Sequence, residues 1–310
     1  MPEPQTIALM DSDMGDCEIE RAILEGSGLR LEDLRGADRV RLDEVLRGAQ
    51  GLMVQYASVD ASLLSRCPKL RAVVTYGVGT DHIDRVEAEA RGIVVLPVTD
   101  YCVNEVADHT LALVLACTRS VSGLANAVCR GEWPATSSLG SLLSIDGLRY
   151  GLIGFGSIGQ AVARRARAFG ADVRAFDPFA PDRVFDREEV TRVSLEEAFC
   201  SDIVSVHVPL TPDTFHLVTG ELLGRIPTHG VFVNVARGDV VEESALTELA
   251  LSGRVTVALD VMSQEPPPAD HILARSDRVI VTPHVAWFST TAEHRLREKA
   301  AMLIGRQLTE

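Results

Sequence analysis

The chain has few of the features that mark disulfide-stapled or zinc-bound proteins. Its 310 residues include six cysteines, and no two of them form a CxxC pair. A disulfide framework or a structural zinc site is built from thiols at close, regular spacing. The scattered cysteines indicate neither, so we interpret them as buried thiols and predict no metal site.

Positive charge and long apolar runs are also scarce. There are 30 Lys and Arg residues against 44 Asp and Glu, and no basic patch stands out. Nucleic acids and anionic membrane surfaces are therefore disfavoured as main partners, because they repel an acidic protein. The acidic start does not resemble a signal peptide, and apolar runs such as 111–117 are too short to cross a bilayer. We expect a cytoplasmic protein.

The chain does contain enough apolar material for a large core. Hydrophobic residues make up 46% of it, and its length favours two domains. Short β-rich runs alternate with helical stretches up to about residue 98, as in parallel βαβ units, and a second α/β series begins near residue 149. We predict an α/β protein with two Rossmann- or flavodoxin-like domains and parallel sheets, one formed by 1–100 plus 288–310 and the other by 101–287.

An apolar stretch joins the two series. Residues 106–128 are apolar on nearly all sides when drawn as a helix, which requires other protein over most of the helix surface. A symmetric dimer is the commonest way to bury such a surface. We therefore predict a homodimer with the helix from Val106 to Thr118 in its interface.

A glycine-rich turn carries the cofactor signature. Gly154, Gly156 and Gly159 stand in GxGxxG spacing, directly after an apolar strand and before an Ala-rich helix. The first glycine permits a tight turn, the second lets the backbone approach a pyrophosphate, and the third allows close helix packing. Ser157 and Ile158 complete the helix N-terminus, whose free N–H groups bind anions.

The next strand-like run ends in an acid. A carboxylate at Asp177 can accept hydrogen bonds from the adenosine ribose hydroxyls and repel a 2′-phosphate, so the sequence favours NAD over NADP. Arg174 and Arg183 lie nearby and weaken that preference. The alternative interpretation of Asp177 is a turn former ahead of Pro178.

Motifs spread over nearly the whole sequence point to one family. The segments are YGVGTDHID, GIVVLPVTDYCVNEVADHTLAL, GLIGFGSIGQAVA, VHVPLTPDTFHLV, FVNVARGDVVEESAL, ALDVMSQEP and VTPHVAW. In this order they resemble the NAD-dependent D-2-hydroxyacid dehydrogenase family, and the segment 282–287 is most similar to the branch that contains the C-terminal-binding-protein corepressors. The resemblance implies an active site in a cleft between a substrate-binding and an NAD-binding domain.

By this resemblance Arg237, Glu265 and His284 are the catalytic residues. Reduction of a 2-keto acid needs a proton donor that cycles near neutral pH, which suits His284. A carboxylate at Glu265 would orient the imidazole and favour its charged form. The guanidinium of Arg237 offers a fork of donors for the substrate carboxylate and keto oxygen. Taken singly, His284 could be a turn residue, Glu265 an acid of a surface loop and Arg237 a member of a surface ion pair. Their joint occurrence in family order favours catalysis.

The same resemblance places four further residues beside the cofactor. These are His207, Pro209, Ala236 and Asp260. Asp260 is expected near the nicotinamide carboxamide, and its alternative is a structural acid at a strand end.

Substrate contacts are expected from two segments. The backbone N–H groups of Gly77, Val78 and Gly79 can bind a carboxylate, unless the segment is an ordinary glycine turn. Trp287 could wall the pocket around an apolar substrate or belong to the core. Met262 stands where many relatives have an aromatic residue, which alters packing behind the catalytic acid.

The leading hypothesis is an NAD-dependent enzyme that interconverts a 2-keto acid and a D-2-hydroxy acid. The main alternative is an NAD(H)-sensing, protein-binding module like the corepressors. The sequence ends at Glu310, soon after its last predicted helix and without a long regulatory tail, which we take as evidence against the corepressor-like alternative and against an amino-acid-regulated phosphoglycerate dehydrogenase. A relative acting on formate or phosphite is a weaker third hypothesis, because such small substrates need no apolar wall at Trp287.

Overall fold

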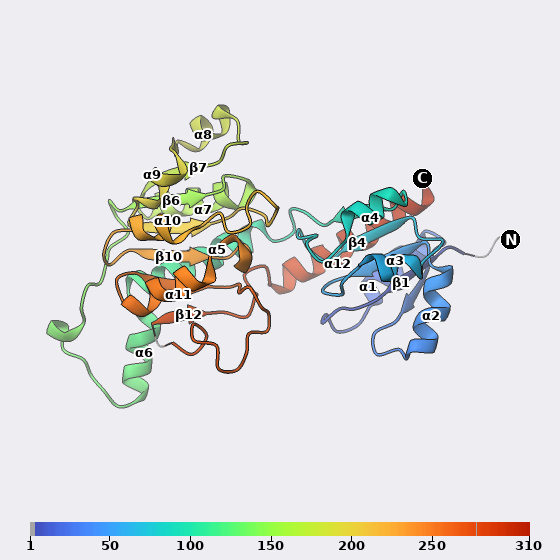
Figure 1. The fold of residues 1–310 in the computed structure, drawn as a ribbon, viewed down its shortest axis with the longest axis horizontal. Helices are drawn as coiled ribbons and strands as arrows, with labels where there is room; N and C mark the ends of the chain where they lie inside the picture. The colour runs from blue at the N-terminus through green and yellow to red at the C-terminus, as the bar shows by residue number, and fades with distance from the viewer. Residues whose placement is uncertain (1–3, 277) are drawn as a thin grey trace. The chain divides into compact units, whose positions relative to one another are not determined.

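The computed structural model describes residues 4–276 and 278–310 (Figure 1). These residues form two compact units, one of 4–102 with 289–310 and one of 103–288. Each unit contains a parallel sheet with helices, so the predicted α/β class with two parallel sheets is confirmed.

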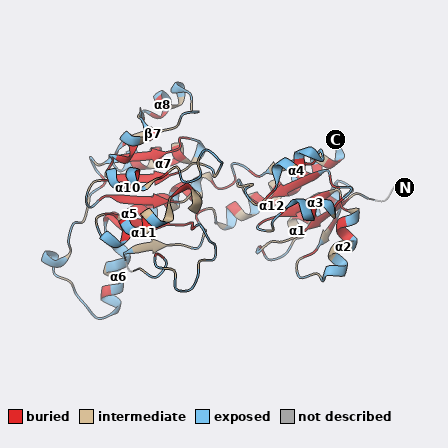
Figure 2. Ribbon diagram, viewed as in Figure 1, coloured by how far each residue is buried: buried red, intermediate tan, exposed pale blue. Residues whose placement is uncertain are grey.

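A five-stranded parallel sheet with the order β2-β1-β3-β4-β5 forms the centre of the first unit. Its strands are β1 (Thr6–Leu9), β2 (Arg30–Asp33), β3 (Gly51–Val54), β4 (Ala72–Thr75) and β5 (Val94–Pro97). Its helices are α1 (Glu18–Gly26), α2 (Arg39–Gly48), α3 (Ala61–Ser65), α4 (Arg85–Ala90) and α12 (Thr290–Thr309). Strands β1, β3 and β4 are buried throughout, as Figure 2 shows, because parallel sheets are covered on both faces.

Alternate residues of these strands serve two separate layers. Leu52 and Val73 face a core shared with α2, α3 and α4. On the other face α1 and α12 pack against each other and α12 packs on β4. Gly51 makes room there, since a Cβ atom would lie 2.8 Å from Ile304 Cδ1. The last helix thus covers one face of the sheet that the first hundred residues form.

A buried ionic network joins α1, α12 and the end of β4. Arg297 donates from Nε and Nη2 to the two carboxylate oxygens of Glu20, at 2.9 Å each. Tyr76 Oη donates to Glu20 Oε1 at 2.9 Å, and Arg297 Nη2 also reaches Asp16 Oδ1 at 2.8 Å. Side chains of Arg297 and Glu20 are only 6% and 3% exposed. Every charge buried here is therefore paired, as burial requires.

The second unit contains a seven-stranded parallel sheet with the order β12-β11-β10-β9-β6-β7-β8. The strands are β6 (Arg149–Ile153), β7 (Asp172–Phe176), β8 (Thr191–Arg192), β9 (Ile203–Val206), β10 (Val231–Asn234), β11 (Thr256–Leu259) and β12 (Val279–Val281). The α-helices are α5 (Val103–Thr118), α6 (Val121–Cys129), α7 (Ser157–Ala168), α8 (Asp182–Glu188), α9 (Leu195–Phe199), α10 (Gly220–Arg225) and α11 (Glu243–Ser252). Short 3₁₀ turns are η1 (Thr136–Ser138) and η2 (Gly238–Val240).

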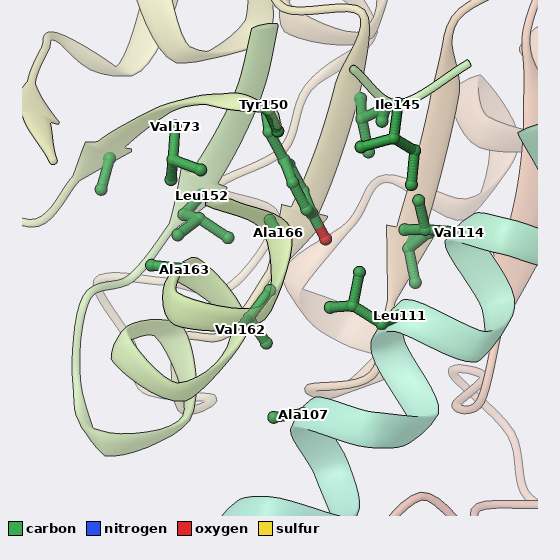
Figure 3. Close-up of a cluster of buried hydrophobic side chains, with 14 of the residues drawn as sticks. Ala107, Leu111, Val114, Ile145, Tyr150, Leu152, Val162, Ala163, Ala166 and Val173 are labelled. Atoms are coloured by element: carbon green, nitrogen blue, oxygen red, sulfur yellow. The ribbon is translucent and has the colours of Figure 1, made fainter. Parts of the chain in front are cut away.

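Two cores cover the faces of this sheet. One contains Tyr150 and Leu152 of β6 between α5 and α7, and Figure 3 shows the Tyr150 ring lying among side chains of both helices. The other packs α9, α10 and α11 against the opposite face, around Phe232 and Val257. Residues of β6 alternate between the two, since Ile153 belongs to the second core.

The apolar helix predicted from the sequence is α5, and most of its apolar side chains are buried within its own unit. Leu111 and Val114 are 4% and 0% exposed. In α6, by contrast, Val121 and Val128 are 54% and 49% exposed. No single helix in 4–276 and 278–310 is long and apolar enough to cross a membrane. The pair α5 and α6 meets the length and composition requirements only jointly, and is bent by 62°.

Cysteine burial differs in part from expectation. All six thiols are free. Cys67, Cys102 and Cys117 are buried, but Cys129 and Cys200 are exposed. The expectation of buried thiols is wrong for these last two, because each lies at the C-terminal end of a helix on the surface.

Candidate active site

Most of the predicted cofactor-binding and catalytic residues lie along one edge of the sheet in the second unit. In a parallel sheet the carboxyl ends of all strands lie along the same edge, and ligands of open α/β sheets bind there. The pairing aligns the last residues of β7, β6, β9, β10, β11 and β12 in one row. Among the residues that directly follow these strands are Gly154, Asp177, His207, Asp260 and Thr282. Residues far apart in the sequence thus become neighbours.

The glycine turn between β6 and α7 has the shape that a pyrophosphate requires. Gly154 has φ +97°, and a Cβ atom there would lie 2.7 Å from the carbonyl oxygen of His207. A Cβ atom at Gly159 would lie 2.3 Å from the Gly154 carbonyl oxygen, so the first turn of α7 packs directly on the loop. A Cβ atom at Gly156 would meet no other part of the protein within 4 Å. Two glycines therefore serve packing, and the middle one faces a space that a ligand can approach.

The N-terminus of α7 is free to bind an anion. Gly156 is its N-cap residue and supplies no side-chain cap, and Ser157, Ile158 and Gly159 form the first turn. The first N–H groups of a helix have no partners within the helix, and its dipole adds partial positive charge. Together with the open space at Gly156, this end of the helix fits the phosphates of a dinucleotide.

Asp177 ties the glycine turn to the end of β7. Its Oδ2 accepts a hydrogen bond from Phe155 N at 2.8 Å, and its Oδ1 accepts from Phe179 N at 2.8 Å and Ala180 N at 3.0 Å. The turn-forming role that the sequence left open is therefore real. It is compatible with ribose recognition, because a carboxylate has about four acceptor positions and three are used.

His207 lies against the glycine turn as a neutral imidazole. Its Nε2 is 2.7 Å from Ser205 Oγ, and its Nδ1 is buried without a hydrogen-bond partner among the described residues. Burial lowers the pKa of His207 to about 3. An unpartnered nitrogen next to the pyrophosphate turn fits a position beside the cofactor.

Pro209 and Ala236 are placed by the loops that follow β9 and β10. The Pro209 carbonyl accepts a hydrogen bond from Thr214 Oγ1 at 2.6 Å. Ala236 N donates to Asn234 Oδ1 at 3.0 Å, and Asn234 itself is buried. Both loops leave the sheet at the same edge as the glycine turn.

His284 and Glu265 form a close pair. His284 Nδ1 lies 2.7 Å from Glu265 Oε2, and the two side chains are 35% and 37% exposed. Burial raises the pKa of the Glu265 carboxyl. The hydrogen bond from His284, its charge, the Met262 amide and the charge of Arg237 outweigh burial and hold that pKa below its ordinary value. Glu265 is therefore an ionised partner for the imidazole.

Arg237 lies in the loop after β10, and a buried side chain at the end of β10 holds its backbone. Asn234 Nδ2 donates to the Arg237 carbonyl at 2.9 Å. The guanidinium Nη1 donates to the Ala236 carbonyl at 2.8 Å. Because its charge contributes to the lowered pKa of Glu265, Arg237 belongs to the same local electrostatic group as the pair.

Asp260 organises the segment that carries His284. Its carboxylate accepts hydrogen bonds from Val285 N at 3.0 Å and Ala286 N at 2.8 Å, and from Thr282 Oγ1 at 2.5 Å. Its carbonyl accepts from His284 N at 2.8 Å. The structural role left open for this acid is thus observed, and the carboxamide contact stays a prediction.

Two residues of this network were not singled out from the sequence. His109 Nε2 of α5 lies 3.0 Å from Thr282 Oγ1 and 3.6 Å from Asp260 Oδ1. No sequence pattern indicates a role for His109, because its partners Thr282 and Asp260 lie about 150 or more residues away along the chain. A polar residue on a mostly apolar helix was the one available signal.

The predicted substrate residues are divided between the units. Gly77, Val78 and Gly79 follow β4 in the first unit, where Val78 is 49% exposed. Trp287 belongs to the second unit, is partly buried, and makes an edge-to-face contact with Phe288 at 5.5 Å between ring centroids. The role of Trp287 as a wall of the substrate pocket stays a prediction. Within 4–276 and 278–310, no cluster of His, Cys, Asp and Glu side chains could hold a metal ion.

A parallel sheet with a glycine turn, an acid after its second strand and a paired histidine at the same edge defines a dinucleotide-dependent oxidoreductase. Residues 111–286, more than half of the chain, match the sequence model of the family described as D-isomer specific 2-hydroxyacid dehydrogenase, NAD binding domain. The chain belongs to this family.

Individual relatives agree. Glycerate dehydrogenase of Methylorubrum extorquens is 35% identical over 263 residues, covering 83% of this chain and 82% of the relative. D-3-phosphoglycerate dehydrogenase of Mycobacterium tuberculosis is 35% identical over 273 residues, covering 87% of this chain but 51% of the relative. The chain thus spans about half the length of that relative.

A solved structure is similar over nearly its whole length. The D-lactate dehydrogenase of Aquifex aeolicus, complexed with NAD and lactic acid, has a TM-score of 0.87 and 26% identity, covering 98% of this chain and 96% of that one. The predicted family, the enzyme class and NAD as cofactor are confirmed. The likeness to the corepressor branch stays a prediction.

Proposed function

We propose that this protein reduces a 2-keto acid to a D-2-hydroxy acid with His284 as proton donor. The observation that carries the proposal is the 2.7 Å contact between His284 Nδ1 and Glu265 Oε2, at the sheet edge that also holds the glycine turn. A histidine held by an ionised carboxylate, close to an arginine, is what reduction of a carbonyl next to a carboxylate requires.

His284 supplies the proton in this scheme. NADH, when bound, supplies the hydride that adds to the carbonyl carbon. Because Nδ1 faces Glu265, the proton leaves from Nε2 to the carbonyl oxygen as that oxygen gains charge. Glu265 stabilises the protonated imidazole and fixes its orientation. In the reverse direction Nε2 takes the hydroxyl proton back.

Arg237 binds the substrate and lowers the barrier. Its guanidinium can hold the carboxylate by two parallel hydrogen bonds and polarise the neighbouring keto oxygen. In the first unit, the N–H groups of the loop at Gly77, Val78 and Gly79 are further candidates for binding the carboxylate. Trp287 is the candidate wall for the substrate side chain.

The cofactor contacts follow from the glycine turn. Gly154, Gly156 and Gly159 shape the site, and the N–H groups of Ser157 and Ile158 in the first turn of α7 would hold the pyrophosphate. Asp177 would bind the adenosine ribose and favour NAD over NADP. The flanking positions are His207, Pro209, Ala236 and Asp260.

Turnover of a panel of 2-keto acids with NADH tests the proposal. The intact protein should oxidise NADH with at least one 2-keto acid, and His284→Ala should lower kcat by on the order of 100-fold because general acid catalysis is lost. NADH affinity should be kept. His294→Ala, at a surface pair with Glu298, is the matched control. Tight NADH binding without turnover would favour the NAD(H)-sensing alternative, and full turnover by His284→Ala would overturn the proton-donor role.

A homodimer in the cytoplasm, without nucleic-acid or membrane partners, completes the proposal. Since α5 is largely buried in its own unit, it offers little surface for a dimer interface. The segment that follows α5 exposes apolar side chains instead. Val121 and Val128 of α6 are about half exposed, and Trp133 is 88% exposed. Apolar side chains gathered on one exposed segment favour a second protein surface over it.

A further inference from the structure

The proposed acid Glu265 lies in a segment without regular structure. Residues 260–276 form neither helix nor strand. A working carboxylate has to be held within about 0.5 Å of its productive position, which a loop achieves only when other groups support it. The segment therefore needs fixed points on both sides of Glu265.

Glu243, the first residue of α11, contacts the segment at two such points. Its Oε2 accepts a hydrogen bond from Ser263 N at 3.3 Å, two residues before Glu265. Its Oε1 lies 3.0 Å from His271 Nε2, six residues after Glu265. One carboxylate thus connects both halves of the segment to a helix of the sheet's second core.

The contact between Glu243 and His271 is a charge-assisted hydrogen bond. His271 Nδ1 is buried without a partner among the described residues, so a proton on that nitrogen would be costly and Nε2 is the donor. Burial raises the pKa of Glu243, but the hydrogen bonds from His271 and Ser263 outweigh it and keep that pKa low. The helix N-terminus also favours the negative charge.

Packing fixes the same segment on either side. A Cβ atom at Gly238 would lie 2.1 Å from Met262 C and 2.2 Å from Ser263 N, so the turn after Arg237 is in direct backbone contact with the segment. Met262 and Leu273 are 7% and 0% exposed within the second core. The segment is thereby anchored just before Glu265 and again just after His271.

We propose that Glu243 and His271 are positioning residues that hold Glu265 against His284 by clamping residues 263–271. The inference rests on the proposed roles of Glu265 and His284. Neither clamp residue is required to touch substrate or cofactor. Loss of the clamp should weaken the pairing of Glu265 with the imidazole and leave NADH binding intact.

The test compares two substitutions at His271. His271→Leu removes the donor and should lower kcat about 10-fold while NADH affinity stays within about 2-fold. The pH above which kcat/KM for reduction falls should move down by about half a unit, because a weaker carboxylate contact favours the proton on His284 less. His271→Gln keeps an N–H donor at similar reach and should restore most of the activity. His294→Leu serves as the control, since it removes an exposed His–Glu pair.

A double-mutant cycle decides whether the effect passes through Glu265. In a Glu265→Gln background, His271→Leu should cost less than about 2-fold in kcat, since coupled residues are not additive. Additive effects, or no rescue by His271→Gln, would overturn the clamp. If His271→Leu does not fold, Glu243→Gln keeps the volume, and we expect a loss of about 3-fold with the same direction of pH shift. An unchanged pH profile there would also overturn it.

The two proposals fail in different ways. His284→Ala measured in the same assay reports on the proposed function alone. A large loss with His284→Ala and none with His271→Leu would leave the function standing and remove the clamp.

Discussion

At the scale of single residues, the carboxylates at the edge of the second sheet have different roles, which depend on the groups that donate hydrogen bonds to them. Asp177 and Asp260 accept backbone N–H groups and shape loops. Glu265 accepts from one backbone N–H and pairs with an imidazole. The same functional group thus serves as a structural cap in two places and as a charge partner in the third.

Asp177 should influence both cofactor choice and stability. We expect Asp177→Ala to narrow the preference for NADH over NADPH, because repulsion of a 2′-phosphate is lost. It should also lower the melting temperature, since N–H groups of Phe155, Phe179 and Ala180 lose their acceptor. Asp177→Asn keeps an acceptor and should separate the two effects. A constant NADH to NADPH ratio in kcat/KM for both variants would place ribose recognition elsewhere.

His207 should make the folded state sensitive to acid. Its pKa is lowered to about 3, whereas an unfolded histidine titrates near 6.5, so the unfolded chain binds the proton first. Its stabilising contribution is complete above pH 6.5 and declines as pH falls from there towards 3. Between pH 7 and 4.5 we expect this single group to cost about 2–3 kcal/mol of unfolding free energy.

Urea unfolding at a series of pH values measures this contribution. The difference in unfolding free energy between wild type and His207→Gln should shrink by that amount as the pH is lowered, because glutamine does not titrate. His294→Gln, at an exposed pair, is the control. Parallel stability curves for wild type and His207→Gln would contradict a neutral His207 imidazole in the folded protein.

At the scale of elements, the network between α1, α12 and β4 should be worth several kcal/mol to the first unit. Arg297→Met leaves the buried carboxylate of Glu20 without its cation, and removing one partner of a buried pair typically costs about 3–5 kcal/mol. Arg91→Met breaks the more exposed pair with Glu87 and should cost less than about 1 kcal/mol. Equal denaturation midpoints for the two variants would show that the buried network adds no stability.

Strand ends were the elements that sequence reasoning located best. An apolar strand followed by a glycine or an acid indicates the carboxyl edge of a sheet, and this pattern predicts Gly154 and Asp177, whereas His207 and Asp260 follow from the family resemblance. The pairing of Glu265 with His284 needed the resemblance as well, because no local pattern measures the distance between two loops.

The supporting contacts could not be predicted in the same way. His109 meets Thr282 across 173 residues, and Glu243 meets His271 across 28. Both depend on how a helix packs against a loop, which hydrophobic periodicity does not specify. The need for glycine at position 238 is likewise visible only in the structure, where the backbone of Met262 and Ser263 lies against it.

At the scale of the whole molecule, the assembly state follows from where apolar surface remains. The sequence placed the dimer interface on α5, but that helix is mostly covered within one chain. We expect sedimentation velocity to show a dimer, and Val121→Glu combined with Val128→Glu in α6 to shift it towards monomer by placing charge on the exposed face. Val86→Glu, at an exposed valine of α4 in the first unit, is the control. A monomer at all concentrations would exclude the proposed homodimer.

The return of α12 to the first sheet also sets an order of events during translation. A ribosome synthesises residues 103–288 before it adds Arg297, so Glu20 and Tyr76 lack their cation until the last helix has been made. Domains tend to fold as they emerge. The part of the protein that is synthesised first therefore depends on the part that is synthesised last, and a nascent chain halted at residue 288 would carry an acidic first unit that lacks α12 and Arg297.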